Sequence, residues 1–249
     1  MSGHSKWHNI KIRKQAQDAK KSKAFSKVSR EIIMAAKDGG GDPDINNRLR
    51  VAIEKARAAG LPQDNVKRAI QRGTGDVQGV TFEPAVYEGY GPGGVAVMVQ
   101  ILTDNRNRAV SELRSIFGKH GGNLGAANCV AWLFDQKGII LVPQEGVSEE
   151  KVLEIALEAG AEDVQADDSS YEISTAPGDL EGVKKALEKN DVPFESAEVT
   201  MVPQNRVTLK EKQAQQVLRL MDALEEQDDV QQVYANFDIP DRIMEAIAA

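Results

Sequence analysis

The sequence is poor in the side chains that build disulfides and metal sites. Cys129 is the single cysteine among 249 residues, which excludes an internal disulfide. The three histidines, His4, His8 and His120, are scattered, and with one cysteine they do not make a four-ligand zinc pattern. We therefore expect no metal ion and no bound cofactor.

The sequence also lacks a long apolar segment. No stretch approaches the roughly 18 consecutive apolar residues that a membrane helix requires, and no apolar signal core follows the basic N-terminus. Apolar residues make up 41% and charged residues 28% of the chain, as in ordinary globular proteins. We expect a cytoplasmic protein with no membrane partner, and we expect it to be a monomer.

No combination of residues is typical of a catalytic site. Cys129 lies in an apolar stretch without a neighbouring base, which predicts a core residue. The glycine-rich stretches 89–94 and 120–125 match no nucleotide-binding motif, and tight turns are the simpler interpretation of both. Acidic pairs such as Asp228 and Asp229 are more simply solvated surface than catalytic carboxylates. We therefore predict that the protein is not an enzyme.

Positive charge is concentrated in the N-terminal third. Residues 1–80 contain 17 Lys and Arg and 8 Asp and Glu, a net charge of +9. Residues 81–249 contain 14 and 30, a net charge of −16. A chain sorted in this way presents one face to a polyanion while the remainder repels it. A basic segment that is merely solvated is the alternative explanation.

Residues 1–23, here called the arm, carry seven Lys and Arg and one acid. Trp7 lies among these cations, a mixture in which an indole stacks on an unpaired base while the charges neutralise phosphates. Residues 2–19 of the arm have too little apolar surface to offset their ordering entropy, so we expect this segment to be mobile until bound. Trp7 as a hydrophobic anchor and His4 with His8 as a metal pair are the alternatives. The candidate nucleic-acid-binding residues of the arm are Lys6, Trp7, Lys11, Arg13, Lys14, Lys20 and Lys21.

A second candidate contact lies at TDNRNR, residues 103–108, where an expected strand leads into a helix. Helix N-termini carry unpaired N–H groups and a partial positive charge, so Arg106 and Arg108 oppose the dipole preference there. A bound phosphate would relieve this conflict. Asp104 offers the alternative, because its carboxylate can neutralise the arginines internally. We include Arg106 and Arg108 among the candidate nucleic-acid contacts.

Apolar spacing predicts three helices before residue 80. The first is capped by Ser22 and ends at the glycines 39–41. The second starts at Asp42–Pro43 and buries a stripe that begins with Ile45. A shorter third helix ends at Gly73. Together they predict a small helical bundle.

Beyond a glycine-rich linker at residues 73–79 the spacing changes to that of strands. Residues 128–134, NCVAWLF, predict one strand, and residues 230–237 predict another that needs a partner in the earlier sheet. The predicted fold class is α+β, an N-terminal helical bundle followed by two ferredoxin-like α/β domains, one inserted in the other. The expected domains are a basic helical nucleic-acid-binding domain with its arm (1–80), an α/β domain (81–136 plus 204–249) and an inserted βαββαβ domain (137–203).

Four stretches resemble the YebC family, in order and along the whole chain. They are GHSKWHNIKIRKQAQDAKKSKAFSK, NVKRAIQRGTG, YEGYGPGGVAVMVQILTDNRNR and GKHGGNLG. The resemblance implies a helical N-terminal domain and two α/β domains, one inserted in the other. Members are described as probable transcriptional regulatory proteins that bind DNA; mitochondrial relatives are translational activators, and some bacterial members look like ribosome-associated factors that relieve stalling. It also implies nucleic-acid contact at Lys6, Trp7, Lys11, Arg13 and Lys14, and at Arg106 and Arg108.

We predict a non-enzymatic, nucleic-acid-binding regulator of gene expression that associates with RNA or the ribosome and relieves stalling. A basic arm containing Trp suits penetration of folded RNA, and no helix-turn-helix with a symmetric dimer interface is recognisable. A DNA-binding transcriptional regulator, the family's usual description, is the alternative. An effector-sensing module built on ferredoxin-like domains and an unrecognised enzyme are the remaining hypotheses.

Overall fold

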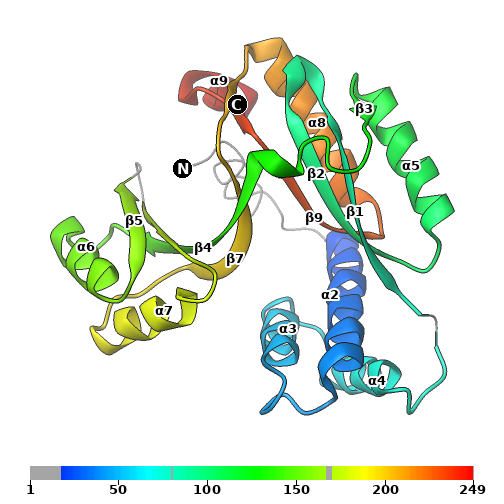
Figure 1. Ribbon diagram of the computed structural model, residues 1–249, viewed down its shortest axis with the longest axis horizontal. Coiled ribbons are helices and arrows are strands. Elements are labelled where there is room, and N and C mark those ends of the chain that lie inside the picture. The colour runs from blue at the N-terminus through cyan, green and yellow to red at the C-terminus, as the bar shows by residue number, and fades with distance from the viewer. Residues whose placement is uncertain (1–17, 80, 167–169, 249) are drawn as a thin grey trace.

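The computed structural model describes residues 18–79, 81–166 and 170–248, which form three lobes (Figure 1). The helical lobe contains α2 (Asp18–Gly39), α3 (Asn47–Ala58) and α4 (Gln63–Thr74). The main sheet lobe and the inserted lobe are each built on a four-stranded antiparallel sheet. The predicted α+β fold class, with N-terminal helices followed by two α/β units, is confirmed.

The helices of the helical lobe pack around a core of their own. α4 approaches α2 most closely at Gly73, where a Cβ atom would lie 2.5 Å from the Ile33 carbonyl oxygen and 2.6 Å from the Ala36 Cβ. Only glycine permits this approach without a backbone shift. The buried apolar residues of the lobe are Ile32, Ile33, Ala35, Ala36, Leu49, Ala52, Ala56, Leu61, Val66 and Ala69.

Two predicted helix starts are wrong. α2 begins before Ser22, so this serine lies inside the helix and does not cap it. α3 begins after Asn46, whose side chain accepts a backbone N–H of the first turn and makes it the N-cap in place of Asp42. Ile45 therefore precedes the helix and is 83% exposed instead of belonging to its buried stripe.

The main sheet has the strand order β3-β1-β2-β9. Its centre is the hairpin of β1 (Glu83–Tyr90) and β2 (Ala96–Thr103), joined by the short 3-10 helix η1 (Pro92–Gly94). β3 (Asn123–Leu124) pairs with β1, and β9 (Val230–Ala235) pairs with β2. The predicted return of the last long strand to the earlier sheet is thereby confirmed.

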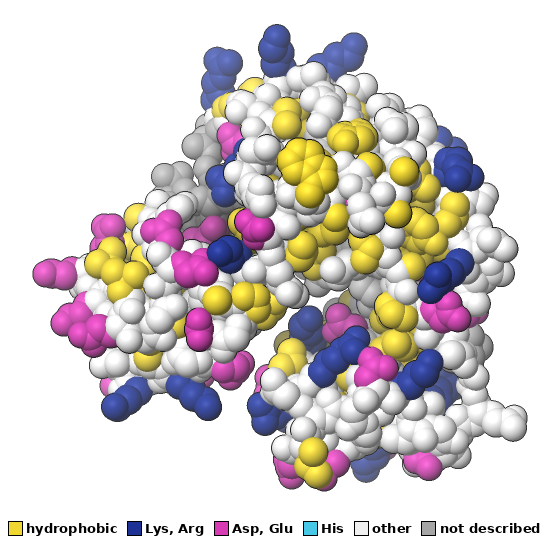
Figure 2. Space-filling model, viewed as in Figure 1, with side chains coloured by type: hydrophobic (Ala, Val, Ile, Leu, Met, Phe, Trp, Pro, Cys, Tyr) yellow, Lys and Arg dark blue, Asp and Glu magenta, His cyan; other side chains and the backbone are white. Residues whose placement is uncertain are grey.

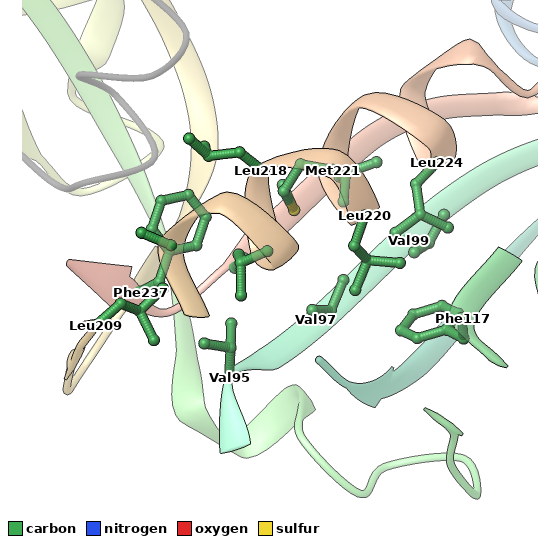
Figure 3. Packing of buried hydrophobic residues seen from close by; sticks show 14 of the residues in the cluster. Val95, Val97, Val99, Phe117, Leu209, Leu218, Leu220, Met221, Leu224 and Phe237 are labelled. Atoms are coloured by element: carbon green, nitrogen blue, oxygen red, sulfur yellow. The ribbon is translucent and has the colours of Figure 1, made fainter. Parts of the chain in front are cut away.

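Two helices, α5 (Arg106–Lys119) and α8 (Glu211–Glu226), cover one face of the main sheet (Figure 1). Side chains of α8 interdigitate with those of β2, and Phe117 of α5 completes this layer (Figure 3). Two helices on one face of four antiparallel strands is the ferredoxin-like layout, here with a hairpin at the centre of the sheet. The labelled core residues are Val95, Val97, Val99, Phe117, Leu209, Leu218, Leu220, Met221, Leu224 and Phe237.

The opposite face of the main sheet is covered by a segment that the sequence predicts as a strand. Residues 128–133 form a turn and the 3-10 helix η2 (Ala131–Leu133) instead, and Phe134 begins the next strand. An apolar run indicates burial but does not by itself distinguish a strand from another buried conformation. Val130 and Phe134 are buried against this face, whereas Trp132 is 67% exposed.

The inserted lobe has the predicted βαββαβ order, with the strands arranged β5-β6-β4-β7 in the sheet. Both helices share one buried cluster with the sheet. The elements are β4 (Phe134–Pro143), α6 (Glu149–Glu158), β5 (Ala161–Ala166), β6 (Ser170–Thr175), α7 (Leu180–Lys189) and β7 (Ser196–Pro203).

The C-terminal part of the chain completes the main sheet lobe. β8 (Val207–Thr208) pairs in parallel with β10 (Phe237–Asp238). The last helix, α9 (Asp241–Ala248), buries Ile243 and Met244 in the main core. Across the described residues, each helix is too short or too polar to cross a membrane.

Candidate nucleic-acid interface

The helical lobe exposes cations on α4. Lys67, Arg68 and Arg72 lie on its solvent face, while Val66 and Ala69 are buried on the other side. Among the described residues, no acid forms an ion pair with these three cations. Figure 2 shows Lys and Arg side chains over the helical lobe and many Asp and Glu side chains over the inserted lobe. The α4 cations are therefore available to an external anion.

Most of the arm lies outside the described residues. The structure describes the backbone from Asp18 and the side chains from Lys23. The backbone of Lys20 and Lys21 lies within helix α2, so the C-terminal end of the arm is helical. Nucleic-acid contact by the arm stays a prediction. Its residues outside the description are Lys6, Trp7, Lys11, Arg13 and Lys14.

Arg106 and Arg108 lie in the first turn of α5, where a strand does lead into a helix. Asn105 is the N-cap, and its side chain accepts the backbone N–H of Arg108 at 3.0 Å. The Arg106 guanidinium lies 3.0 Å from the Glu83 carboxylate, and the two side chains are 59% and 58% exposed. Exposed pairs of this kind contribute little to stability, so Arg106 is accessible to a phosphate.

Arg108 has two internal partners. Its Nη2 lies 2.8 Å from Asp229 Oδ2 and 2.7 Å from Asp104 Oδ1. Hydrogen bonds to Asp229, and then to Asp104, raise the pKa of Arg108 above its ordinary value. Asp104 therefore neutralises the charge of Arg108 internally, which is the alternative that the sequence suggested. Asp229 contributes to the same neutralisation. Contact of Arg108 with nucleic acid stays a prediction.

Asp229 lies where the helical lobe meets the main sheet lobe, and its side chain is 2% exposed. Its Oδ2 accepts hydrogen bonds from Thr103 Oγ1 at 2.9 Å and from Arg108 at 2.8 Å, and its Oδ1 lies 3.3 Å from Arg30 of α2. Arg30 also donates to the Asp228 carbonyl oxygen. A buried carboxylate requires such partners, because its desolvation is costly when it is unpaired.

Two further cations of α2 reach the C-terminal end of α8. Lys23 Nζ donates to the Glu226 carbonyl oxygen at 2.9 Å, and Lys27 Nζ to the Glu225 carbonyl oxygen at 2.6 Å. The last carbonyls of a helix lack intrahelical partners and carry partial negative charge, so cations stabilise this end. We call the clasp the contacts of Lys23, Lys27 and Arg30 with the residues 225–229 that end α8 and precede β9.

A buried carboxylate also organises the segment before η2. Glu88 of β1 is 5% exposed, and its Oε1 accepts the Asn128 N–H at 2.7 Å. Its Oε2 accepts the N–H groups of Val130 at 2.7 Å and Ala131 at 2.8 Å. These bonds fix the conformation of the segment. Sequence reasoning missed Glu88, because β1 gives no local signal for a partner 40 residues away.

Cys129 lies in the same segment and is partly buried. Burial raises the pKa of its thiol, and the negative charge of Glu88 raises it further. A thiol with a raised pKa is protonated at neutral pH and is a poor nucleophile. The structural role predicted for Cys129 fits this environment.

Within the part of the chain that the structure describes, no group of three or more His, Cys, Asp or Glu side chains could hold a metal ion. A groove of about 460 Å³ lies between α6 and α7. Small-molecule sites are mostly apolar with a few polar groups. Charged side chains dominate this groove, so it gives little support to the effector hypothesis. Its lining residues are Lys151, Glu154, Ile155, Glu158, Ala159, Ala186, Lys189 and Asn190.

Two family models match the chain on either side of the linker between α4 and β1. The model of the TACO1/YebC protein N-terminal domain matches residues 5–76, and that of the TACO1/YebC second and third domain matches residues 82–237. The chain belongs to the TACO1/YebC family. The resemblance found in the sequence is thereby confirmed.

Relatives align along their whole length with this TACO1/YebC family member. A protein of Dictyoglomus turgidum is 55% identical over 249 residues, covering 100% of both chains. One of Geobacter sulfurreducens is 55% identical, covering 99% of this chain and 100% of its own. Both are named probable transcriptional regulatory proteins. The crystal structure of a conserved hypothetical protein from Aquifex aeolicus has a TM-score of 0.79 at 54% identity, covering 90% of this chain and 92% of its own.

Proposed function

We propose that this TACO1/YebC family member is a non-enzymatic, nucleic-acid-binding regulator of gene expression. The observation that carries the proposal is the division of charge between the lobes. Residues 1–80 have a net charge of +9. The inserted segment 137–203 contains five Lys and Arg and 16 Asp and Glu, a net charge of −11. A polyanion is attracted by the first and repelled by the second, which orients the protein on it.

RNA in the context of the ribosome is the target that we propose, with relief of stalled elongation as the outcome. The cations on α4 contact phosphates without reading a base sequence, and the arm adds an aromatic residue suited to unpaired bases. The proposed contacts are Lys6, Trp7, Lys11, Arg13, Lys14, Lys20, Lys21, Arg106 and Arg108, to which we add the exposed Lys67, Arg68 and Arg72 of α4.

A DNA-binding transcriptional regulator is the second candidate. The observation that favours it is the name carried by the relatives, probable transcriptional regulatory protein. Phosphate contacts do not distinguish DNA from RNA, so the α4 cations serve either target. The two candidates differ in what the bound protein changes, which is translation in one case and transcription in the other.

Binding is tested with fluorescently labelled single-stranded RNA and duplex DNA across a salt series. We expect Arg68→Gln/Arg72→Gln to weaken binding about tenfold at 0.15 M salt and to reduce the salt slope by about 1.5, because each phosphate contact contributes 0.7–0.9. Lys185→Gln/Lys189→Gln on α7 makes the same charge change at the same helical spacing and should have little effect. Equal losses in the two double variants would show that net charge acts, and not the α4 face.

A purified translation system and a purified transcription system separate the two candidates. We expect added protein to restore elongation on messages that stall ribosomes, and the α4 double variant to lose this effect. Unchanged elongation together with a response of one promoter would replace the ribosomal proposal with the DNA-binding one. Absence of binding to either nucleic acid at low salt would remove both.

A further inference from the structure

The clasp engages cations that lie beside the proposed nucleic-acid interface. Lys23 belongs to the arm, and Lys27 and Arg30 follow it on the same helix. All three are bound in this structure to oxygen atoms at the end of α8 or to Asp229. We propose that the clasp is an autoinhibitory contact, in which the end of α8 and nucleic-acid phosphates compete for these cations. The inference rests on the proposed function and adds a regulation to it.

The contacts that the clasp makes across the junction between the two lobes are polar, which lets them control the orientation of the lobes. The apolar core of the helical lobe and that of the main sheet lobe have no buried residue in common. Phe82, in the linker, packs against the helical core, and Arg30 lies 5.2 Å from its ring centre. Junctions without a large apolar interface permit relative movement of the units that they join. The clasp therefore contributes directly to the position of the helical lobe.

Phosphate can replace the carbonyl acceptors of Lys23 and Lys27. Both lysines donate to a neutral carbonyl oxygen, which carries the partial charge of a helix end, and Lys27 also has a further partner. A phosphate oxygen carries a full charge, and charge-assisted hydrogen bonds are the stronger ones. In a polyanion, each neutralised phosphate also releases counterions. Nucleic acid therefore competes effectively with the two carbonyl oxygens.

Release of Arg30 leaves Asp229 with other partners. The carboxylate keeps the Thr103 hydroxyl at 2.9 Å and the Arg108 guanidinium at 2.8 Å. Opening the clasp therefore does not leave a buried charge unpaired, which would oppose release strongly. In the closed arrangement Oδ1 accepts no hydrogen bond and has the Arg30 ion pair at 3.3 Å, whereas Oδ2 keeps both of its donors when Arg30 leaves. In such an equilibrium, the apparent affinity for nucleic acid is reduced by the fraction of molecules that are closed.

The distance between the lobes reports the state of the clasp. Spin labels are attached to the exposed positions Ala58→Cys on α3 and Ser115→Cys on α5, in a chain whose own cysteine is removed by Cys129→Ser. Pulsed electron resonance then measures the label separation with and without single-stranded RNA. We expect one narrow distribution for the free protein and a shifted or broadened one with RNA bound.

We expect two clasp variants to change the label separation in the same way but the affinity for RNA in opposite directions. Asp229→Asn removes the charge that holds Arg30, so we expect a broadened distribution without RNA and RNA binding about fivefold tighter. Arg30→Gln should broaden the distribution equally and weaken RNA binding, because it removes a cation that phosphate uses. Glu211→Gln makes the Asp229→Asn charge change at the opposite end of α8 and should leave the distribution unchanged.

The outcomes separate this inference from the proposed function. RNA that binds the wild-type protein without altering the label distance overturns the autoinhibitory clasp and leaves nucleic-acid binding intact. No binding of RNA or DNA at low salt removes the proposed function and the inference together. Should Asp229→Asn fail to fold, the label distribution of Arg30→Gln without RNA decides, and a narrow, unchanged distribution overturns the clasp.

Discussion

Two neighbouring arginines on α5 have different roles in the structure. Arg106 pairs with Glu83 on the surface, whereas Arg108 contacts the buried carboxylate of Asp229. An exposed ion pair contributes little to the free energy of unfolding. Removing a partner from a buried charge costs more stability, because that charge is then poorly compensated. Arg108 thus supports the fold directly, and Arg106 is the more accessible of the two for binding.

We expect Arg108→Gln to lower the free energy of unfolding by about 1–2 kcal/mol, less than for a fully buried pair because Arg108 is 43% exposed. Arg106→Gln should change it by less than about 0.5 kcal/mol. Urea unfolding measures both values. If Arg106→Gln weakens nucleic-acid binding while stability is unchanged, Arg106 is a binding residue. Equal stability of the two variants would contradict the assigned role of Asp229.

The sequence predicts the placement of these arginines but not their buried partner. A strand leading into a helix puts both at the start of α5, and the local acid Asp104 is visible four residues before Arg108. Asp229 is 121 residues away and comes close through the pairing of β9 with β2. In sequence it is part of an acidic pair and resembles ordinary solvated surface. Contacts between such distant residues depend on the tertiary fold and leave no local pattern.

At the scale of single elements, α4 packs closely on α2 because residue 73 has no side chain. A Cβ atom there would lie 2.5 Å from the Ile33 carbonyl oxygen and overlap it. Because this oxygen belongs to the backbone, it cannot easily move away. Gly118, near the end of α5, is also helical, and nothing lies within 4 Å of a Cβ at that position. The two glycines therefore separate the effect of packing from that of helix propensity.

We expect Gly73→Ala to lower the free energy of unfolding by about 1–3 kcal/mol through overpacking, despite the better helix propensity of alanine. Gly118→Ala should raise it by up to about 1 kcal/mol, since only propensity changes there. Thermal melting followed by circular dichroism compares both with the wild type. A stabilised Gly73→Ala variant would show that α2 and α4 are farther apart in solution than in this structure.

Apolar periodicity predicts the helices well, since burial against one partner repeats every three to four residues. It predicts the ends of the helices less well, because an N-cap depends on whether one side chain accepts a hydrogen bond from a backbone N–H. Asn46 and Asp42 are both suitable caps in sequence, and Asn46 is the one used. Residues 128–134 have the composition of a strand, but residues 128–131 are held in a turn by Glu88, a residue of another element.

At the scale of the whole molecule, the inserted lobe leaves and rejoins the main sheet lobe through one pair of strands. Gln136 of β4 and Met201 of β7 are opposite one another in this antiparallel pair. Phe134 and Met201 pack against the main sheet, while the inserted lobe has a separate core. The βαββαβ order was predictable from alternating patterns, but the strand pairing that closes the insertion was not. We propose that this lobe, predicted as residues 137–203, is an independently folding domain.

Replacing residues 137–200 by Asn-Gly tests this proposal. A two-residue Asn-Gly turn suits a hairpin between directly opposed residues, so Gln136 and Met201 stay paired. We expect the shortened chain to unfold cooperatively in thermal melts, with the core of the main sheet lobe intact. Its RNA binding at low salt should be retained or tightened, because the segment removed carries a net charge of −11.

A chain in which the same turn joins Gln136 to Val202 provides the control. It differs by one residue, because Met201, which packs against the main sheet, is removed and the register of the β4–β7 pair is shifted by one. We expect this control to melt at a lower temperature than the Gln136–Met201 chain. If both shortened chains are unfolded while the full chain is stable, the main sheet lobe requires the inserted lobe. The division of the chain at residues 136 and 204 would then be wrong.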